Sequence, residues 1–460
     1  MNYIVSGIWG KICVGLFFSF FVTACEKEQH KTAAPTLVQQ LNVVAATTVL
    51  ATVSAQVTLN APNGHQEGDP PKILINEQGK GSVYVAYQND TAYVVLNGQP
   101  GKVYKKIDNL SLSPDGQRTA YGITVNEKRA IVFDGKEGVY FKDVWDPIFS
   151  PDGHHIAYIA QIGDKSHIAV DDRITDEAYP SVFSGSPVFS GDSSKVAYHL
   201  VPGGNRKGKL IVNSLNLKNQ KAWDCNNDVL ITNRDKTRIA AVNSVNGKER
   251  VLDINFSQPD EVKEGPLFDG ISNVNYGDDG ASLSYVAAKE GKKFLILNDK
   301  DELLPDGDLR ESPVVRPDLK GAGVLLVTSE GFYLHQAFMG NTLKAKKYQE
   351  AAGLVYNKDC SQLAFIARAA KNIFMVVNGN NGPFYDMIVK PMFSPDGKLL
   401  IFRARKEGKR FVVVADQNGK VVREHPRYEM VFDTTFTADG KSVAYGVKDG
   451  DKLVWKVEKL

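Results

Sequence analysis

The sequence predicts an all-β fold built from about ten copies of one four-stranded unit. A short signature recurs along the chain, as in Phe149-Ser150-Pro151-Asp152-Gly153 and Phe393-Ser394-Pro395-Asp396-Gly397. Its Asp returns at intervals of 37 to 44 residues, and a repeat near 40 residues is typical of propeller blades. Runs rich in Val, Ile and aromatic residues lie between these turns, as in strands. Together these observations indicate a β-propeller of four-stranded antiparallel blades.

The overall composition is that of an ordinary globular protein. The chain has 460 residues, of which 43% are hydrophobic and 23% are charged. The formal net charge of +2 gives no general attraction to polyanions, so we expect no nucleic-acid partner.

Residues 1–24 are predicted to be an export signal. Lys11 precedes the apolar run 12–22, which is too short to cross a bilayer as a stable helix. The following Val22-Thr23-Ala24-Cys25 resembles the bacterial lipoprotein cleavage box, which implies a lipid on Cys25. Glu26, where an Asp would resemble an inner-membrane retention signal, favours the periplasmic side of the outer membrane. The alternatives are a plain signal peptide and an uncleaved anchor.

Between this signal and the first repeat we expect a tether and one isolated strand. Residues 25–46 are polar and then rich in Ala and Thr, which is typical of a tether. Apolar and polar residues then alternate over 48–59, with Leu50 as the one exception, and this period of two predicts a β-strand. We assign 47–460 to the propeller, with its repeats over 72–460.

The repeats share one internal order. Aligned on the turn Asp, they fall at Gln78, Asp115, Asp152, Asp192, Asp235, Asp279, Asp318, Asp359, Asp396 and Asp439. Each unit begins with a strand before the turn and a second strand after it. A charged turn with Gly comes next, and a third strand rich in β-branched residues follows. In the unit of Asp396 we expect the fourth strand around 428–431. Pro and Gly suit the turn because Pro presets φ and Gly accepts a positive φ.

These signatures resemble the TolB-like, WD40-like propeller repeat, in which Phe-Ser-Pro-Asp-Gly is followed by Ala-Tyr, as in Ala157-Tyr158 and Ala444-Tyr445. The resemblance covers 72–460 and is weaker at Asn233-Arg234-Asp235 and Arg316-Pro317-Asp318. It implies a propeller, and only the propeller part of that family is expected here, because no room is left for a separate N-terminal α/β domain.

The two ends of the repeat region predict how the ring closes. The last unit contains three strands, and the unassigned strand over 48–59 would supply its fourth and cover an open edge. We therefore predict a single ring of eight to ten blades closed by this N-terminal strand. The alternative is two smaller stacked propellers.

Turn charges differ between the two faces of such a ring. Turns between second and third strands sum to +10, and turns between third and fourth strands sum to −5. A basic face would meet an anionic partner, such as an envelope protein or another anionic envelope component; the alternative is that these turns are merely solvated. The candidate binding residues on this face are Arg206, Lys207, Lys209, Lys292, Lys293, Arg405, Lys406, Lys409 and Arg410.

The chain lacks the motifs of the common catalytic and metal sites. No Gly-x-Ser-x-Gly, His-Glu-x-x-His, Cys-x-x-Cys or phosphate loop occurs. His154 and His155 are adjacent on a strand, so we expect a solvated pair and no metal site. Cys225 and Cys360 are expected to be separate thiols. We expect no catalytic residue, metal or cofactor.

The sequence thus predicts a non-catalytic, lipid-anchored propeller of the bacterial periplasm and envelope that acts as a protein-binding or assembly scaffold. Its contact with the membrane would be through the lipid alone. The alternatives are a hydrolase- or lactonase-type propeller enzyme with a site at the central funnel and a surface glycan-binding or adhesion protein.

Overall fold

The computed structural model describes residues 46–59, 72–76, 78–178, 181–182, 187–201, 208–226, 230–329, 331–339, 341–343, 348–437 and 439–460. Every regular element in these ranges is a β-strand. Within them, no helix has the length and apolar character that a bilayer crossing requires. The predicted signal peptide, Cys25 and the tether up to residue 45 lie outside the described residues.

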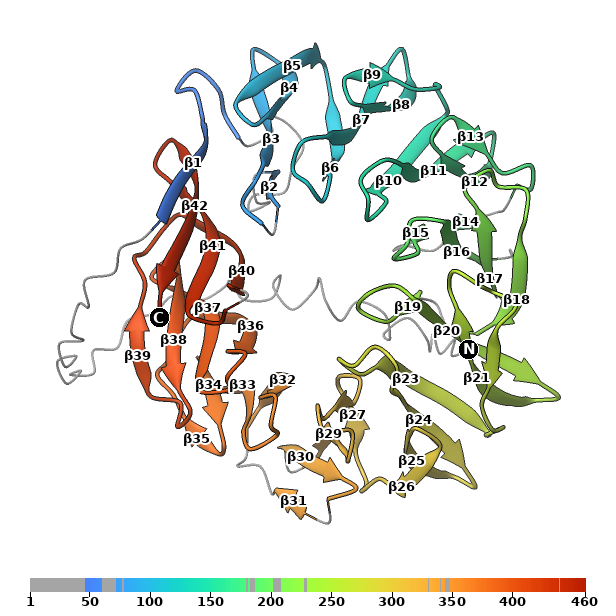
Figure 1. Ribbon diagram of the computed structural model, residues 1–460, viewed down its shortest axis with the longest axis vertical. Coiled ribbons are helices and arrows are strands. Elements are labelled where there is room, and N and C mark those ends of the chain that lie inside the picture. Colours follow the sequence, from blue (N-terminus) through green and yellow to red (C-terminus); the bar gives the residue numbers. More distant parts are fainter. Residues whose placement is uncertain are drawn as a thin grey trace, which may run out of the picture. The chain divides into compact units, whose positions relative to one another are not determined.

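Ten separate antiparallel sheets follow one another around a ring, and each sheet is one blade (Figure 1). The propeller prediction is therefore confirmed, at the upper end of the predicted range of eight to ten blades. All ten blades belong to one ring, so the alternative of two stacked propellers is wrong.

The strands of the first five blades have the following bounds. Blade 1 has β2 (Ile73–Ile75), β3 (Ser82–Gln88), β4 (Thr91–Leu96) and β5 (Gln99–Tyr104). Blade 2 has β6 (Ile107–Leu112), β7 (Thr119–Val125), β8 (Lys128–Phe133) and β9 (Lys136–Glu137). Blade 3 has β10 (Asp143–Phe149), β11 (Ile156–Ile162), β12 (Lys165–Val170) and β13 (Arg173–Ile174). Blade 4 has β14 (Ser181–Val182), β15 (Val188–Phe189), β16 (Lys195–Val201), β17 (Gly208–Ser214) and β18 (Lys221–Cys225). Blade 5 has β19 (Ile231–Thr232), β20 (Arg238–Val245), β21 (Lys248–Asn255) and β22 (Val262–Glu264).

The remaining five blades continue the series. Blade 6 has β23 (Gly270–Tyr276), β24 (Leu283–Lys289), β25 (Lys292–Leu297) and β26 (Lys300–Leu303). Blade 7 has β27 (Asp308–Leu309), β28 (Val314–Val315), β29 (Ala322–Thr328), β30 (Gly331–Ala337) and β31 (Asn341–Leu343). Blade 8 has β32 (Glu350–Tyr356), β33 (Leu363–Ala369), β34 (Asn372–Val377) and β35 (Asn380–Asn381). Blade 9 has β36 (Met387–Phe393), β37 (Leu399–Lys406), β38 (Lys409–Asp416) and β39 (Val421–Glu424). Blade 10 has β40 (Met430–Phe436), β41 (Ser442–Asp449), β42 (Lys452–Lys459) and β1 (Ala46–Thr52).

Each blade runs from a first strand near the centre of the ring to a fourth strand at its periphery (Figure 1). In blades 4 and 7 the first strand is split in two, and both pieces pair with the second strand. The fourth strand of blade 9 is β39, so the prediction of a fourth strand around 428–431 is wrong. Residues 430–431 already belong to β40, the first strand of the next blade. Tyr428 instead forms an isolated bridge with Arg410 of β38.

The strand β1 closes the ring, because it pairs antiparallel with β42 as the outer strand of the last blade. Its register shifts between Val49 and Ala51, so Leu50 is the extra residue of a β-bulge. The strand ends at Thr52, opposite Lys452, where β42 itself begins. It is therefore shorter at its C-terminal end than the predicted 48–59, because its partner strand stops there.

The recurring signature forms the corner between the first and second strands. The Ser394 hydroxyl donates to Asp396 Oδ1 at 2.7 Å and accepts from the Leu399 N–H at 2.9 Å. The Gly397 N–H donates to the Ser394 carbonyl at 2.8 Å, and Gly397 has a φ of 73°. The corners beginning at Ser113, Ser150, Ser190 and Thr437 have the same bonds. The signature is thus a fold determinant, since it fixes where each first strand turns back.

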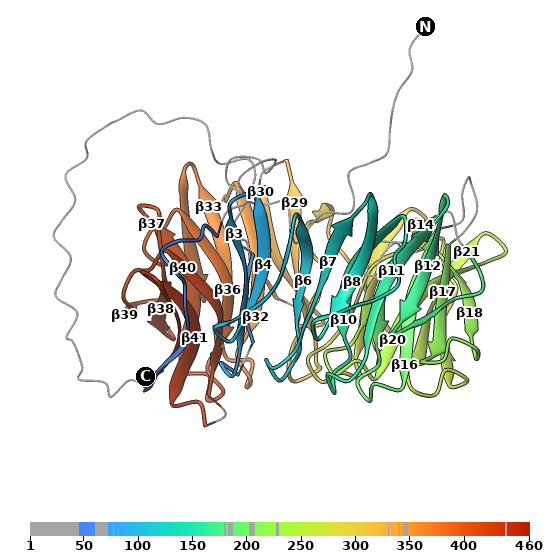
Figure 2. The same ribbon diagram turned by 90° about the horizontal axis from the view of Figure 1, so that it is seen from above.

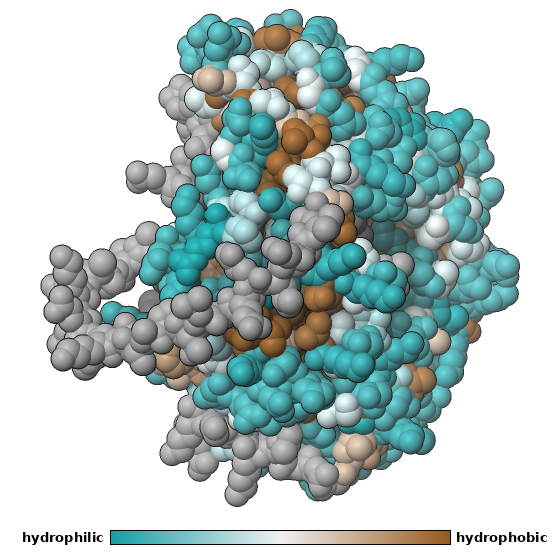
Figure 3. Space-filling model, turned by 60° about the vertical axis from the view of Figure 1, so that its left-hand side comes forward, coloured by the Kyte–Doolittle hydropathy of each residue, from teal (hydrophilic) through white to brown (hydrophobic). Residues whose placement is uncertain are grey.

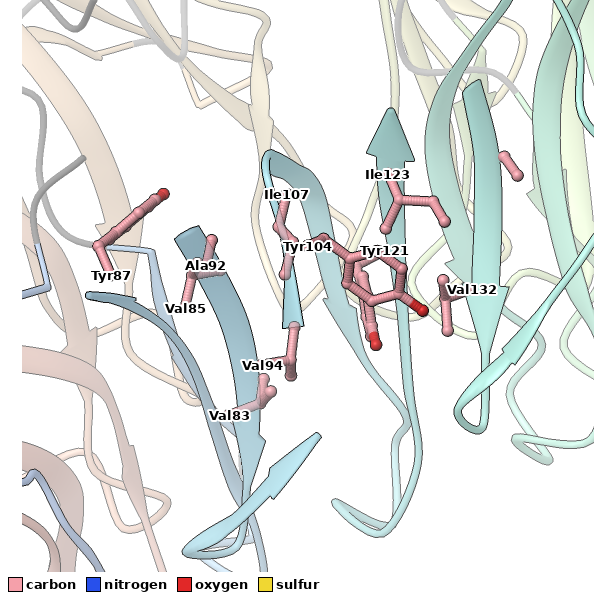
Figure 4. Packing of buried hydrophobic residues seen from close by; sticks show 11 residues of the cluster. Val83, Val85, Tyr87, Ala92, Val94, Tyr104, Ile107, Tyr121, Ile123 and Val132 are labelled. Atoms are coloured by element: carbon pink, nitrogen blue, oxygen red, sulfur yellow. The ribbon is translucent and has the colours of Figure 1, made fainter. Parts of the chain in front are cut away.

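Buried apolar clusters lie between neighbouring blades and hold the ring together. Figure 4 shows one of them, where Val83 and Val94 of blade 1 and Ile123 of blade 2 are buried with Tyr104 and Tyr121. The two tyrosine rings meet edge to face at 6.2 Å. The same edge-to-face contact recurs at the pairs Phe141–Tyr158, Phe268–Tyr285, Tyr348–Phe365 and Tyr385–Phe402. Each pair joins the chain leaving one blade to the second strand of the next.

Candidate functional site

The hairpins that join second and third strands lie on one face of the ring, because every blade has the same strand order (Figure 2). The predicted binding residues on this face belong to three blades. Lys209 is the second residue of β17 in blade 4, and Lys292 and Lys293 are the first two residues of β25 in blade 6. In blade 9, Arg405 and Lys406 end β37, and Lys409 and Arg410 begin β38. Arg206 and Lys207 lie outside the described residues.

In blades 4 and 6 most of the described cations have a carboxylate nearby. Lys293 Nζ lies 3.0 Å from Asp308 Oδ1 and donates to the Gly307 carbonyl at 3.2 Å. Lys209 lies directly opposite Asp224 of β18. Only Lys292 faces a like charge, because its cross-strand partner is Lys289.

Blade 9 concentrates four cations at one hairpin. Arg405 lies opposite Arg410, and Lys406 lies opposite Lys409. The turn between them, Glu407-Gly408, has φ angles of 53° and 77°, as in the tight two-residue turns of type I′. Like charges directly opposite each other destabilise a strand pair. This hairpin therefore carries an electrostatic cost that folding does not require.

The two pairs point to different sides of the blade. Ile401 and Val412 share a buried cluster with Tyr445 of blade 10, so the side chains of Arg405 and Arg410, on the same side of the sheet, lie toward blade 10. The lysine pair shares its side with Phe402 and Phe411, which pack against Met375 of blade 8. The hairpin thus presents arginines to one neighbour and lysines to the other.

The carboxylates closest to this hairpin have partners other than Arg405, Lys406 and Lys409, and Asp386 Oδ2 accepts the Glu407 N–H at 2.8 Å. Glu407 pairs with Arg427 at 3.1 Å, and Glu429 pairs with Lys448. Arg410 Nη1 donates to the backbone carbonyl of Glu429 at 2.7 Å, which fixes the position of its guanidinium. Within the described part of the chain, Arg405, Lys406 and Lys409 have no ion pair and no side-chain hydrogen bond.

Two arginines on the arginine side have pKa values below the usual range, mainly because they are partly buried. Burial and the neighbouring Arg405 both lower the pKa of Arg410. Burial also lowers the pKa of Arg403, which lies two residues before Arg405 on the same side of β37. Arg403 Nη1 donates to the Val431 carbonyl at 3.2 Å, and Nη2 lies 3.7 Å from Asp433 Oδ1. The turn charges alone did not reveal Arg403, although its spacing of two from Arg405 places both on one side of a strand.

Two carboxyl groups in or next to first strands have raised pKa values. Asp146 lies in a bulge of β10 with a φ of 51°, and burial raises its pKa. Burial also raises the pKa of Glu311, whose carboxylate accepts the Gly353 N–H at 2.9 Å from the next blade. These carboxyl groups belong to different blades. Across the described ranges, no group of three His, Cys, Asp or Glu residues is placed to hold a metal ion.

The histidine and cysteine residues singled out in the sequence are separate in space. His155 Nδ1 lies 2.8 Å from Asp171 Oδ2, whereas His154 Nδ1 lies 3.3 Å from an Arg118 nitrogen. Cys225 and Cys360 are both free thiols, as predicted. Burial raises the pKa of Cys225 to about 12, so this thiol stays protonated.

Hydrophilic residues cover most of the side of the molecule shown in Figure 3, and apolar residues form smaller groups between them. The exposed apolar side chains include Val49 of β1 and Val422 of β39, which lie on outer strands. They are single residues, as is normal for a protein surface.

No protein-family model matches the sequence, and no curated protein matches it. Solved structures similar to the chain include a eukaryotic initiation factor, with 12% identity, a TM-score of 0.42 and coverage of 73% of this chain and 90% of that one. TolB from Acinetobacter baumannii has 12% identity and a TM-score of 0.29, over 65% of this chain and 78% of that one. The β-propeller domain of the Trilobed protease from Pyrococcus furiosus has 12% identity and a TM-score of 0.33, over 60% and 94%. The chain is a ten-bladed β-propeller.

Proposed function

We propose that this propeller is a non-catalytic binding and assembly scaffold of a bacterial envelope, with repeats of the TolB-like family. In this proposal residues 1–24 are removed on export, Cys25 carries a lipid, and the tether over 25–46 holds the ring at the periplasmic side of the outer membrane. The ring then presents its two turn-lined faces to partners. A rigid ring loses little conformational entropy when it binds a large partner.

The observation that supports a binding role best is the hairpin of blade 9. Four cations, Arg405, Lys406, Lys409 and Arg410, lie in two adjacent cross-strand pairs, although like-charged pairs destabilise a sheet. Binding an anionic partner would offset that cost, whereas a structural role gives it no compensation. The partner we propose is therefore an envelope protein or another envelope component that carries negative charge.

The test is a crosslinking pull-down of the full chain from membranes. A variant with Arg405, Lys406, Lys409 and Arg410 all changed to Glu should lose partners that the wild type captures, and this capture should weaken as salt rises. A Cys25→Ser variant should lose partners that require the membrane location.

The matched control changes four lysines of the opposite face, Lys320, Lys358, Lys398 and Lys441, to Glu. These lysines lie in the corners between first and second strands, and the control reverses four charges as the test variant does. It should keep the partners of the wild type. An identical partner list for both quadruple variants would refute the binding role of the blade 9 hairpin.

A further inference from the structure

Blades 8, 9 and 10 each have a basic residue near the end of the second strand. The residue opposite it on the first strand differs from blade to blade. In blade 8 Arg368 lies opposite Glu350, and the two form a two-point ion pair with bonds of 2.6 and 2.8 Å. In blade 10 Lys448 pairs with Glu429, the residue before its opposite neighbour Met430. In both blades the positive charge is therefore neutralised within the protein.

In blade 9 the corresponding neighbour of Arg405 is Met387, which has no charge. On its other side, toward the third strand, Arg405 meets Arg410. Two carboxylates lie nearby. Glu429 is bound to Lys448. Asp386, which precedes Met387 as Glu429 precedes Met430, accepts the Glu407 N–H at 2.8 Å and forms no ion pair with Arg405 among the described residues. Blade 9 thus keeps the arginine of this position but has no carboxylate directly opposite it, as blade 8 has.

The N–H donors of Arg405 and Arg410 that have no partner within the described residues suit an anion with several oxygens. The guanidinium of Arg405 has no partner among the described residues, and Arg410 is held by one nitrogen while its other N–H groups remain. Directly opposite residues of an antiparallel pair lie about 5 Å apart, so the two planar forks reach one ligand. Arg403 adds positive charge behind them, and its Nε is buried without a hydrogen-bond partner in the described part of the chain.

We propose that Arg405 and Arg410 form a binding site for a phosphate monoester, between blades 9 and 10 on the face of the second-to-third-strand hairpins. In blade 8 one carboxylate satisfies one arginine, and by the same matching of charge two adjacent arginines favour a ligand near charge −2 with more than two acceptor oxygens. A phosphate monoester meets both requirements, since it carries a charge of about −1.5 to −2 and three terminal oxygens at neutral pH. This inference rests on the proposed function only in taking the ligand to be part of the anionic partner.

Binding is measured by isothermal titration of the full chain in detergent micelles with inorganic phosphate and with glucose 1-phosphate. Both should bind, and Arg405→Gln should weaken their binding by about tenfold or more, because it removes charge-assisted hydrogen bonds. Glutamate, a carboxylate of comparable size, should bind more weakly than either. Arg368→Gln is the matched control and should leave phosphate binding unchanged, because Arg368 is already neutralised by Glu350.

The sharpest variant is Met387→Glu, which places in blade 9 the carboxylate that blade 8 already has. It should abolish phosphate binding while every arginine remains, and it should raise the thermal unfolding midpoint. Met430→Glu is its control in blade 10, where Lys448 is already paired, and it should keep the affinity of the wild type. Should Met387→Glu fail to fold, Arg405→Gln decides the question alone.

Vesicles distinguish the sources of the phosphate. In one outcome the chain binds glucose 1-phosphate and also vesicles with a phosphate-monoester lipid, but not vesicles with phosphodiester lipids alone. This result supports the site and makes a lipid headgroup a ligand. Binding of glucose 1-phosphate alone supports the site for a soluble or glycan-borne phosphate. Wild-type phosphate affinity in Arg405→Gln would overturn the proposal, and so would an acidic peptide that binds while phosphate does not.

The two proposals fail separately. Loss of phosphate binding in Met387→Glu, with no partner captured from membranes, would uphold this site and refute the scaffold. Captured partners with no phosphate binding by the purified chain would uphold the scaffold and refute this site.

Discussion

In most corners of the ring, one side chain accepts the hydrogen bond that closes the turn. In the corners with the full signature this is a Ser or Thr, and Ser150 and Ser394 are buried. Where the signature is weaker, an asparagine provides the same acceptor: Asn233 Oδ1 accepts from the Arg238 N–H at 3.0 Å, and Asn357 Oδ1 accepts from the Gln362 N–H at 2.9 Å. The weak repeats therefore keep the corner with a different residue, because an amide oxygen can replace the hydroxyl as acceptor.

The corner of blade 7 uses an ion pair instead. Arg316 Nη2 lies 2.8 Å from Asp318 Oδ2, and this contact lowers the pKa of Asp318 to about 2. A carboxylate whose pKa is lower in the folded state stabilises the fold above its ordinary pKa, near 4, and this contribution is lost as the pH falls through about 2.

Arg316→Ala should therefore reduce the loss of stability between about pH 4 and pH 2, because Asp318 would then titrate near its ordinary pKa. The measurement is the thermal unfolding midpoint at a series of pH values. Arg234→Ala is the matched control: Arg234 lies in the equivalent corner of blade 5, is exposed, and has no ion pair among the described residues. An unchanged acid profile in Arg316→Ala would contradict the assignment.

At the scale of elements, the sequence of β1 departs at one residue from the alternation of apolar and polar residues, and the structure has a bulge at that residue. The alternation over 48–59 fails only at Leu50, and Leu50 is the bulged residue in the pairing with β42. A bulge inserts one residue and shifts the alternation of sides, so Val49 before it is exposed whereas Ala51 and Val53 after it are buried. The irregular residue in the pattern was therefore a sign of a bulged strand.

The register of β1 can be tested by a disulfide. Thr47 lies opposite Lys456, at a separation that a disulfide can span, so the double variant Thr47→Cys, Lys456→Cys should crosslink under mild oxidation. The pair Thr48→Cys, Lys456→Cys is one step out of register and should crosslink more slowly. Peptide mapping without reduction measures both, and equal crosslinking in the two variants would contradict the register.

The outer strands were the elements that the sequence predicted least well. The fourth strands β9, β13 and β35 have two residues each, which is too short for any period to be recognised. In blade 9 we expected a fourth strand around 428–431, but this stretch leads into β40, and Tyr428 is buried in one cluster with Tyr445 of the next blade. Aromatic residues there mark the passage between blades.

At the scale of the whole molecule, the ring depends on one contact between distant parts of the sequence. Ala46 lies opposite Val457, so β1 occupies the place that a fourth strand after β42 would take. Without β1, the edge of β42 would expose unpaired backbone groups and invite association between molecules.

A chain that starts at Lys72 should therefore associate and unfold at a lower temperature. A circular permutant with residues 72–460, a linker of about four residues and then residues 46–59 should restore a monomer with the original midpoint, because the linker makes a hairpin of ordinary length. Gel filtration and thermal unfolding measure both chains. A truncated chain as stable as the full one would show that β1 is not needed for closure.

The sequence by itself determined the repeating blade, since the corner residues, the tight Gly turns and the β-branched strands act through local backbone preferences. It also placed four of the nine candidate binding cations in the hairpin of blade 9. Only the tertiary structure decided that ten blades form one ring, and that Met387 takes the place of the neutralising glutamate beside Arg405. Whether a charge is compensated depends on its cross-strand neighbours, and these are set by register and by the packing of blades that lie apart in the sequence.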